Sequence, residues 1–314
     1  MAIYTTYEQI GLAEDVKDDI SMISPVDSPV CSMSKNTAAT ARIHEFQEDE
    51  LDAIKSNKHL EGSAAGTDNS EPTVMRSVNC QIFKETAEIS RTAERVKKYG
   101  RASEMNYQML KRKLAMIRDE ESAVAGDAGG GGRQTGVAGN ASTERELTSV
   151  YSQVDSGNIL FATADRLTGG TAITTTLELE TVMIETMQAL FDGGGDGQYI
   201  ITDSLVAGYF PTFALSAGRN VDVVGGELFN YVDIYRSQFG SYDVVIDRSM
   251  TNTAHAMLLM DFEYSETPIL DPTQDYALAK DGDRERREIV RESTYALTNS
   301  KAAAIVDKIP AALT

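Results

Sequence analysis

The sequence predicts an α+β fold in which long extended segments precede a compact region of helices and strands. Three observations lead to this prediction. Residues 35–92 carry strand-like stretches on both sides of a polar segment, residues 101–125 have helical periodicity, and the chain beyond residue 140 combines apolar strands with an amphipathic helix. Helices and strands that are segregated in this way are typical of α+β proteins. The 314 residues suffice for two modest domains or one larger one.

The composition is that of a soluble globular protein, with 41% hydrophobic and 25% charged residues. No apolar run approaches the ~20 residues that a membrane-spanning helix needs. The N-terminal residues MAIYTTYEQI lack the basic start and apolar core of a secretory signal. We therefore expect a protein that matures in a cytoplasm, with no membrane contact. Cys31 and Cys80 form no CxxC pair, so we expect two inert thiols and no disulfide framework.

The net charge of −19 is concentrated in residues 134–279, which contain 20 acidic and five basic side chains. Such a surface repels nucleic acid, because DNA binding depends on Lys and Arg side chains that neutralise phosphates. The charge distribution therefore argues against sequence-specific DNA binding.

The first 92 residues look extended. Residues 1–34 are acidic and weakly periodic, which indicates an arm with one short helix over Tyr7–Ile20. Thr40–Phe46 and Val78–Ser90 have strand character and enclose a polar tip at His59–Pro72. An isolated two-stranded hairpin is marginal in water, and this one has too few apolar residues for a core of its own. It must therefore pack on its own globular body or lie across another subunit.

Residues 101–125 give the clearest helix. We expect its buried face to be formed by one apolar stripe, flanked by Met105, Met109 and Met116. The stripe consists of Tyr107, Leu110, Leu114 and Ile117. The helix ends in Asp119, Glu120 and Glu121, whose charge is unfavourable at a helix C-terminus. We therefore expect Glu120 and Glu121 to meet basic groups elsewhere, on this chain or on a neighbour.

Beyond a glycine-rich loop at residues 126–139, the pattern predicts a compact α/β region. Its expected elements, in chain order, are a helix over Thr176–Phe191, a strand over Tyr199–Thr202, a helix after Asp203, a hairpin of Val232–Tyr235 with Tyr242–Ile246, a strand over Ala256–Phe262, a charged helix or strand near Asp283–Leu297 and an apolar segment Ala302–Ile309.

No motif supports catalysis, a cofactor or a metal. The string at residues 44–48 starts like a zinc-protease helix but lacks the second histidine. The glycine run has no Gly-Lys-Ser/Thr for a phosphate loop. Asp192 and Asp196 could offer oxygen ligands to calcium, but a helix end followed by a turn explains the glycines between them more simply. No GxSxG sequence occurs, and His255 lies in an ordinary stretch.

Short strings along the chain carry a recognisable order and spacing. They are Ser24-Pro25 with Ser28-Pro29, His44-Glu45-Phe46 with Asp49 and Leu51, Glu61-Gly62, Asn79, Gln81-Ile82-Phe83, Ser90 with Thr92, Gly100-Arg101, Arg118-Asp119-Glu120-Glu121, Gln238-Phe239-Gly240, the segment 244–250 and Lys280-Asp281-Gly282-Asp283. Together they resemble the major capsid proteins of tailed bacteriophages, whose fold is the HK97 type. The resemblance covers residues 20–300 and is densest over 40–125. Phe46 departs from it, because relatives usually carry tryptophan there.

The resemblance implies an HK97-type capsid fold with five parts. These would be an N-terminal arm (1–34), an extended E-loop (35–92), a peripheral domain (93–150) with a spine helix (101–125), an axial domain (151–265) and a C-terminal stretch (266–314) that completes the peripheral and axial domains. The hairpin that cannot stabilise itself would then lie on a neighbouring subunit.

The resemblance also implies a shell protein and not an enzyme. It would assemble into hexamers and pentamers of an icosahedral head around double-stranded DNA, built in the host cytoplasm and carried in the virion. The implied partners are copies of the same chain, a separate scaffolding protein, a portal protein, a decoration protein in some relatives, and packaged DNA contacted non-specifically. Because the match begins near the N-terminus, we expect no fused scaffolding domain, and no motif marks a lysine for cross-linking.

The candidate interface residues follow from this placement. Phe46, Leu51, Ile82 and Phe83 are the expected apolar anchors, and Lys55, Lys58 and Arg76 would set the register against acids opposite them. Glu120 and Glu121 complete the set. Two alternatives stay open on the sequence: an encapsulin-like compartment shell of the same fold, and a soluble α/β binding or hydrolytic protein built on residues 150–265.

Overall fold

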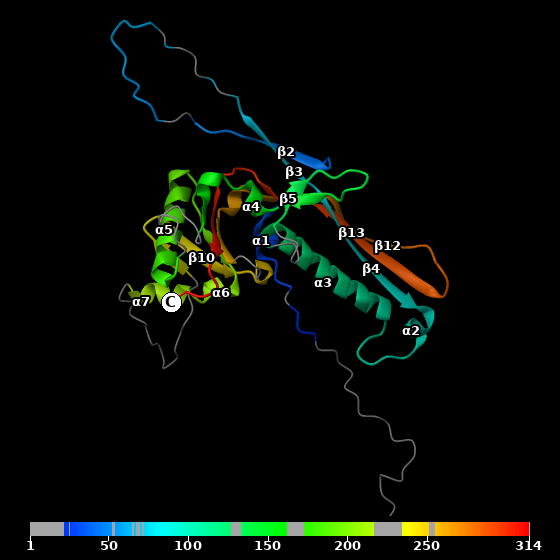
Figure 1. The fold of residues 1–314 in the computed structure, drawn as a ribbon. Helices are drawn as coiled ribbons and strands as arrows, with labels where there is room; N and C mark the ends of the chain where they lie inside the picture. Colours follow the sequence, from blue (N-terminus) through cyan, green and yellow to red (C-terminus); the bar gives the residue numbers. More distant parts are fainter. Residues whose placement is uncertain are drawn as a thin grey trace, which may run out of the picture.

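The computed structural model describes residues 22–313 apart from 25, 52–53, 65, 67–69, 71, 127–132, 162–172, 217–233 and 251–254. The short helix expected over Tyr7–Ile20 lies outside these residues. Figure 1 shows a rounded lobe, an elongated lobe beside it, and a long loop that projects away from both. The rounded lobe is built on a six-stranded sheet and the elongated lobe on a five-stranded sheet. The predicted α+β class is confirmed.

The rounded lobe is organised around a strand that is buried on both faces. The strand order is β7 (Ile159–Phe161), β15 (Ala303–Ile309), β11 (His255–Met260), β8 (Tyr199–Thr202), β10 (Gly240–Ile246), β9 (Ile234–Ser237). In β11, Met257 and Leu259 enter one hydrophobic core while Leu258 and Met260 enter the other. Because both faces are covered, this strand is a continuous apolar run without alternation. The predicted strands at 199–202 and 256–262 are confirmed.

The helix α5 (Thr176–Asp192) covers one face of this sheet, where it packs against β15. It begins with a capping box, in which Thr175 Oγ1 accepts from the Glu178 backbone and Glu178 accepts from the Thr175 backbone. It ends at Gly193, and Gly194 follows with a φ of 88° that favours glycine. Two shorter helices follow β8, α6 (Ser204–Ala207), capped by Asp203, and α7 (Phe210–Ser216). The predicted helices after residues 176 and 203 are thus confirmed.

The elongated lobe joins strands from both ends of the chain. Its order is β1 (Lys35–Ala38), β12 (Ser265–Ala277), β13 (Arg284–Ser293), β4 (Gln81–Ser90), with β14 (Ala296–Leu297) also beside β12. The segment near 283–297, left open between helix and strand, contains two strands, β13 and β14. The sequence did not predict β12, because its polar stretch and its prolines break the usual strand pattern. Pro272 lies where the register with β13 shifts, which is where a proline is tolerated.

The predicted helix at 101–125 is α3 (Glu104–Ala125), which begins at Ser103, whose side chain accepts from the Asn106 backbone. The predicted buried face is wrong. Met105, Met109 and Met116 are buried, whereas Leu110 is 55% exposed. Both stripes have helical spacing, so periodicity alone cannot choose between them. The methionines face the sheet because β4 and β13 lie on that side, and unbranched methionine adapts to an irregular surface.

The predicted two-stranded arm over 35–92 is shorter than expected. Only β2 (Ile43–Glu48) and β3 (Val74–Asn79) pair with each other. The chain then turns at Cys80, and β4 pairs along its full length with β13. The strand predicted at 78–90 is therefore two strands in different sheets, because Phe83, Ala87 and Ile89 alternate toward the core under α3.

The remaining elements are short. The predicted hairpin near 232–246 consists of β9 and β10, with residues 232–233 outside the described part of the chain. The predicted flexible loop at 126–139 is wrong at its end, where β5 (Thr135–Val137) pairs with β6 (Glu146–Thr148). The other short helices are α1 (Pro29–Met33), α2 (Arg91–Arg95), α4 (Val150–Gln153) and the 3₁₀ turns η2 (Ser156–Asn158), η3 (Arg248–Met250) and η4 (Phe262–Tyr264). No helix within the described ranges could cross a membrane.

Candidate assembly surfaces

The segment between β2 and β3 projects from the body, and its base is tied to the rounded lobe. Glu48 Oε1 accepts hydrogen bonds from the backbone and hydroxyl of Ser300, at 2.9 and 2.5 Å. Arg76 Nε donates to the other oxygen of Glu48 at 2.7 Å, and Glu50 pairs with Lys301. Although burial raises the pKa of Glu48, these hydrogen bonds outweigh it and lower the pKa below its ordinary value. The base is thus fixed while the loop extends outward (Figure 1).

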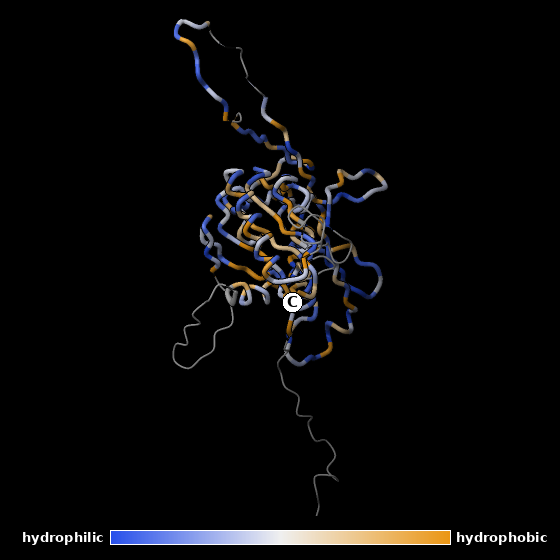
Figure 2. The backbone as a smooth tube through the Cα atoms, turned by 60° about the vertical axis from the view of Figure 1, so that its left-hand side comes forward, coloured by the Kyte–Doolittle hydropathy of each residue, from blue (hydrophilic) through white to orange (hydrophobic). Residues whose placement is uncertain are grey.

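Beyond this base, large apolar side chains face solvent. Leu51 is 96% exposed, Ile54 106% and Leu60 84%, and Val74 and Met75 are more than half exposed. Figure 2 shows orange, hydrophobic positions along the loop that departs from the body, which agrees with the exposed fractions of these side chains. Burying a leucine or isoleucine side chain stabilises by about 1.5–3 kcal/mol, which this subunit alone forgoes. Contiguous exposed apolar side chains are typical of surfaces that bind other molecules.

The polar residues predicted on this arm have mixed surroundings. Lys55 and Lys58 are exposed on the loop. Arg76 lies in β3 and pairs with Glu48 of β2. The acid opposite Arg76 therefore belongs to the neighbouring strand of the same chain. Whether Lys55 and Lys58 contact a second copy stays a prediction.

The four predicted apolar anchors separate into exposed and buried positions. Leu51 is fully exposed, and Ile82 is 45% exposed on the outer face of β4. Phe46 is partly buried in β2, with its ring 6.3 Å from that of His44. Phe83 is only 6% exposed and belongs to the core under α3. Its prediction as an interface anchor is corrected, because its position on β4 points it toward the helix of its own chain.

Glu120 and Glu121 also have partners within the chain. Glu120 accepts from Ser293 Oγ at 2.6 Å and pairs with Arg291 of β13 at 3.1 Å. Glu121 accepts from the backbone of Val30 at 2.7 Å and of Cys31 at 2.9 Å. The Glu120 side chain is 4% exposed and the Glu121 side chain 0%. The expectation of a basic partner is met by Glu120, which pairs with Arg291, but not by Glu121, whose printed partners are backbone N–H groups. The assignment of both acids to a subunit interface is corrected.

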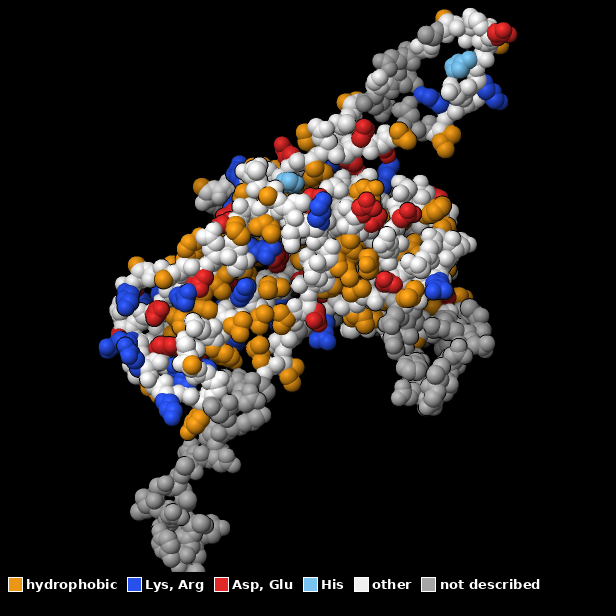
Figure 3. Space-filling view, turned by 180° about the vertical axis from the view of Figure 1, so that it is seen from behind, with side chains coloured by type: hydrophobic (Ala, Val, Ile, Leu, Met, Phe, Trp, Pro, Cys, Tyr) orange, Lys and Arg blue, Asp and Glu red, His pale blue; other side chains and the backbone are white. Residues whose placement is uncertain are grey.

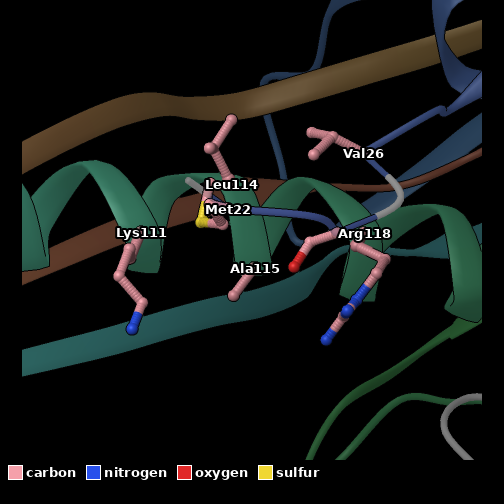
Figure 4. Close-up of a pocket in the computed structure, with 7 residues that line it drawn as sticks. Met22, Val26, Lys111, Leu114, Ala115 and Arg118 are labelled. Carbon is pink, nitrogen blue, oxygen red and sulfur yellow. The ribbon is translucent and has the colours of Figure 1, made fainter. Parts of the chain in front are cut away.

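The sequence did not predict two further surfaces. Met22, Ser24 and Val26 lie along the outer face of α3, where they enclose a pocket of about 170 Å³ together with side chains of the helix such as Leu114 and Arg118 (Figure 4). A larger groove of about 620 Å³ follows the free edge of β4, which pairs with no second described strand on that side. Residues of β4, α2 and α3 line it, among them Ile89, Val96 and Arg112. The only sequence signal for the first surface was the apolar stripe of α3, because Leu114 of that stripe lines the pocket.

Charges and apolar groups are mixed over the rest of the surface. The face in Figure 3 carries Lys, Arg, Asp and Glu side chains side by side over both lobes. Strands β4 and β13 contribute ion pairs to this mixture, including Lys84 with Glu288 at 2.9 Å. The described residues contain no cluster of three or more His, Cys, Asp or Glu that could hold a metal ion. The projecting apolar loop is therefore the most distinctive feature of the surface.

Comparison with known proteins identifies the chain. The family model described as SU10 major capsid protein matches residues 2–310. The chain belongs to this family. The major capsid protein of Escherichia phage Phieco32 is 33% identical over 123 residues, which are 39% of this chain and 35% of that relative. The aligned part is thus about a third of the length of that relative.

Solved structures show the same fold across the whole capsid chain. The capsid of a native GTA particle has a TM-score of 0.67 at 10% identity and covers 98% of this chain and 100% of its own. The encapsulin of the holo-SrpI complex from Synechococcus elongatus PCC 7942 has a TM-score of 0.62 at 9% identity, covering 99% and 97%. The HK97-type fold expected from the sequence is confirmed, and the protein is a phage major capsid protein. The family match favours this assignment over an encapsulin and over a soluble α/β enzyme.

Proposed function

We propose that this capsid protein self-assembles into the hexamers and pentamers of an icosahedral phage head that encloses double-stranded DNA. The observation that carries the proposal is the loop at residues 49–73, which holds Leu51, Ile54 and Leu60 in solvent on a fixed base. An isolated subunit gains nothing from this arrangement, whereas a neighbouring copy would bury these side chains. Many such moderate contacts made together give a closed shell its durability.

The groove along the free edge of β4 is the receiving surface that we propose for this loop. It offers apolar side chains at Ile89 and Val96 and basic ones at Lys98, Arg101 and Arg112. The loop supplies apolar residues together with Asp49 and Glu61. Opposite charges at the two surfaces would guide docking and fix its register, as at other protein interfaces.

The remaining parts of the assembly are proposed on the family membership. Residues 1–34 would form the N-terminal arm, 35–92 the E-loop, 93–150 the peripheral domain, 151–265 the axial domain and 266–314 the stretch that completes both. The partners would be a separate scaffolding protein, a portal protein and in some heads a decoration protein. DNA inside the virion would be contacted non-specifically, and assembly would take place in the host cytoplasm.

The test replaces the three exposed side chains together, as Leu51→Ser, Ile54→Ser and Leu60→Ser. We expect the variant subunit to keep its thermal stability, because the three side chains are exposed and substitutions at such sites usually change stability by less than about 0.5 kcal/mol each. Shells should disappear from electron micrographs and from the sedimenting fraction of the overexpressed protein.

Leu177→Ser is the matched control, since Leu177 is 59% exposed on α5 of the rounded lobe. It should leave shell formation unchanged. Normal shells from the triple variant would contradict the role of the loop. Particles that carry an enzyme cargo and no DNA would instead favour a compartment shell.

A further inference from the structure

Two acidic side chains meet in the interior where the rounded and elongated lobes join. Glu121 lies near the C-terminal end of α3, and Asp247 precedes η3. Both side chains are fully buried, with exposed fractions of 0%. Helix α3 packs against η3 here, and the two carboxyl groups lie close enough to influence each other's ionisation. Asp247 also accepts from the backbone and hydroxyl of Ser249, at 2.8 and 2.6 Å.

The pair fastens the start of the chain to α3. The two oxygens of Glu121 accept the backbone N–H groups of Val30 and Cys31 in α1, at 2.7 and 2.9 Å. The Cys31 thiol lies next to Glu121, and its interaction with the carboxylate lowers the pKa of Glu121 and so opposes the effect of burial. Val30 itself is completely buried beside α3. Residues 22–26 continue from α1 along the outer face of the same helix (Figure 4).

No basic side chain compensates the pair. Within the described residues, no Lys, Arg or His forms an ion pair with Glu121 or Asp247. Two basic groups of neighbouring elements pair with other acids: Arg291 of β13 with Glu120, and Arg248 of η3 with Asp27 at 3.7 Å. The titratable groups facing the pair from the remaining sides are Cys31 of α1, Tyr151 of α4 and Tyr295 beyond β13.

Two carboxylates buried together without a cation cannot both be ionised at low cost, so the pair retains one proton. Burial and the neighbouring Asp247 raise the pKa of Glu121 to about 7. Burial likewise raises the pKa of Asp247. A raised pKa means that the closed arrangement is fully stabilised below about pH 4.5 and loses that stabilisation as the pH rises through about 7.

We propose that the proton shared by Glu121 and Asp247 is a latch for the N-terminal segment, which is held against α3 at low pH and released from it at high pH. Loss of the proton leaves two negative charges in a buried site. Lifting α1 admits water to Glu121 and relieves the repulsion. Residues 22–33 then become available to another copy, a consequence that rests on the proposed shell function, whereas the latch itself belongs to the single subunit.

The structure also indicates where the movement stops. Ser34 donates to or accepts from Ser265 at 2.7 Å, and Ser265 is bonded to Tyr295 at 2.6 Å. From Lys35 onward, β1 pairs with β12. Residues after 34 are therefore held by the sheet, while α1 is held mainly by Val30 and Glu121. The backbone at Ser34 is the hinge.

Cys31 reports the opening and Cys80 serves as an internal control. Cys80 is buried at the turn between β3 and β4, in a different region from the latch. The full-length protein is labelled with iodoacetamide at about pH 5.5 and pH 8.5, and each rate is divided by the rate of the unfolded chain at the same pH. If the pKa of Glu121 is about 7 in the closed state and 4.5 in the open state, the equilibrium constant for opening is roughly 30-fold larger at the higher pH. The normalised labelling rate of Cys31 should rise by about this factor, and that of Cys80 should not change.

Asp247→Asn removes the titration while keeping the geometry, since its amide can donate to Glu121 permanently. Cys31 is partly buried in the closed arrangement, and we expect its normalised labelling rate to be the same at both pH values in this variant. Asp261→Asn, at a buried Asp that caps η4, is the matched control and should behave like the wild-type protein. Equal protection of wild-type Cys31 at both pH values would overturn the latch, and so would a wild-type pH response in Asp247→Asn. Labelling of unassembled subunits and of sedimented shells separately keeps this result independent of assembly.

Discussion

Two antiparallel ribbons of this capsid protein differ in what covers them. The ribbon of β12 and β13 lies with β4 against α3, and its inner face buries Ile289 beside Phe83. Among the described residues, no helix covers the end of the β2–β3 ribbon, and Ile54 and Leu60 beyond it are exposed. The first ribbon is therefore covered within one subunit, whereas we propose that a second copy covers the other.

The largest effect that tests this comparison is expected at Phe83. Phe83→Ala removes a side chain that is 6% exposed in the core under α3 and leaves a cavity. Such substitutions cost about 3–5 kcal/mol, so the free energy of unfolding of the subunit should fall by that amount in chemical denaturation. Ile82→Ala, one residue away on the exposed face of β4, is the control and should cost far less. A small loss at Phe83 would mean that this ribbon, too, depends on a neighbour.

A smaller effect is expected at the base of the projecting ribbon. Glu48→Gln weakens the hydrogen bonds to Ser300 and Arg76, and hydrogen bonds to charged groups contribute about 1.5–3 kcal/mol. We expect faster amide exchange in β2 and β3 with little change in β12 and β13, measured by hydrogen–deuterium exchange. Equal exchange in both ribbons before and after the substitution would contradict the role of this anchor.

The pH dependence of this anchor should be opposite to that of the latch at Glu121. The pKa of Glu48 is lowered, because hydrogen bonds from Ser300 and Arg76 outweigh its burial. Its stabilisation is therefore present above about pH 4.5 and is lost as the pH falls through the lowered pKa. Amide exchange in β2 and β3, corrected for the intrinsic rate, should accelerate below about pH 4 in the wild-type protein and not in Glu48→Gln.

The smallest effect is expected on the outer part of the covered ribbon. Arg287 of β13 pairs with Asp275 of β12, and both side chains are 30–40% exposed. Exposed ion pairs contribute between 0 and about 1 kcal/mol, so Arg287→Gln should barely change the unfolding midpoint. A loss as large as that of Phe83→Ala would show that ion pairs, and not the core, hold this ribbon.

The sequence predicted those elements whose pattern is local. Helix α5 has its capping box, its apolar face and its terminal glycines within 20 residues, and β8 and β11 are short apolar runs bounded by polar residues. The sequence also predicted that the loop between β2 and β3 has no core of its own, because it is polar and holds few apolar residues. Leu51 was singled out, but Ile54 and Leu60, which are equally exposed, were not.

Elements that depend on distant partners were missed. β12 is a strand because β1 and β13, which are separated from each other by more than 240 residues, lie on its two sides. The buried face of α3 could not be chosen from two apolar stripes, and Phe83 and Ile82 could not be assigned to inside and outside before the partner of β4 was known. Glu121 was noticed only as a charge at a helix end.

The sequence by itself determined the fold class, the family and the existence of a segment that cannot form its own core, since these follow from composition, periodicity and the order of short strings. The tertiary structure decided which side chains are left uncovered and which acids are enclosed. Burial and the pairing of charges depend on what the rest of the chain places within a few ångströms, and the local sequence does not contain that information.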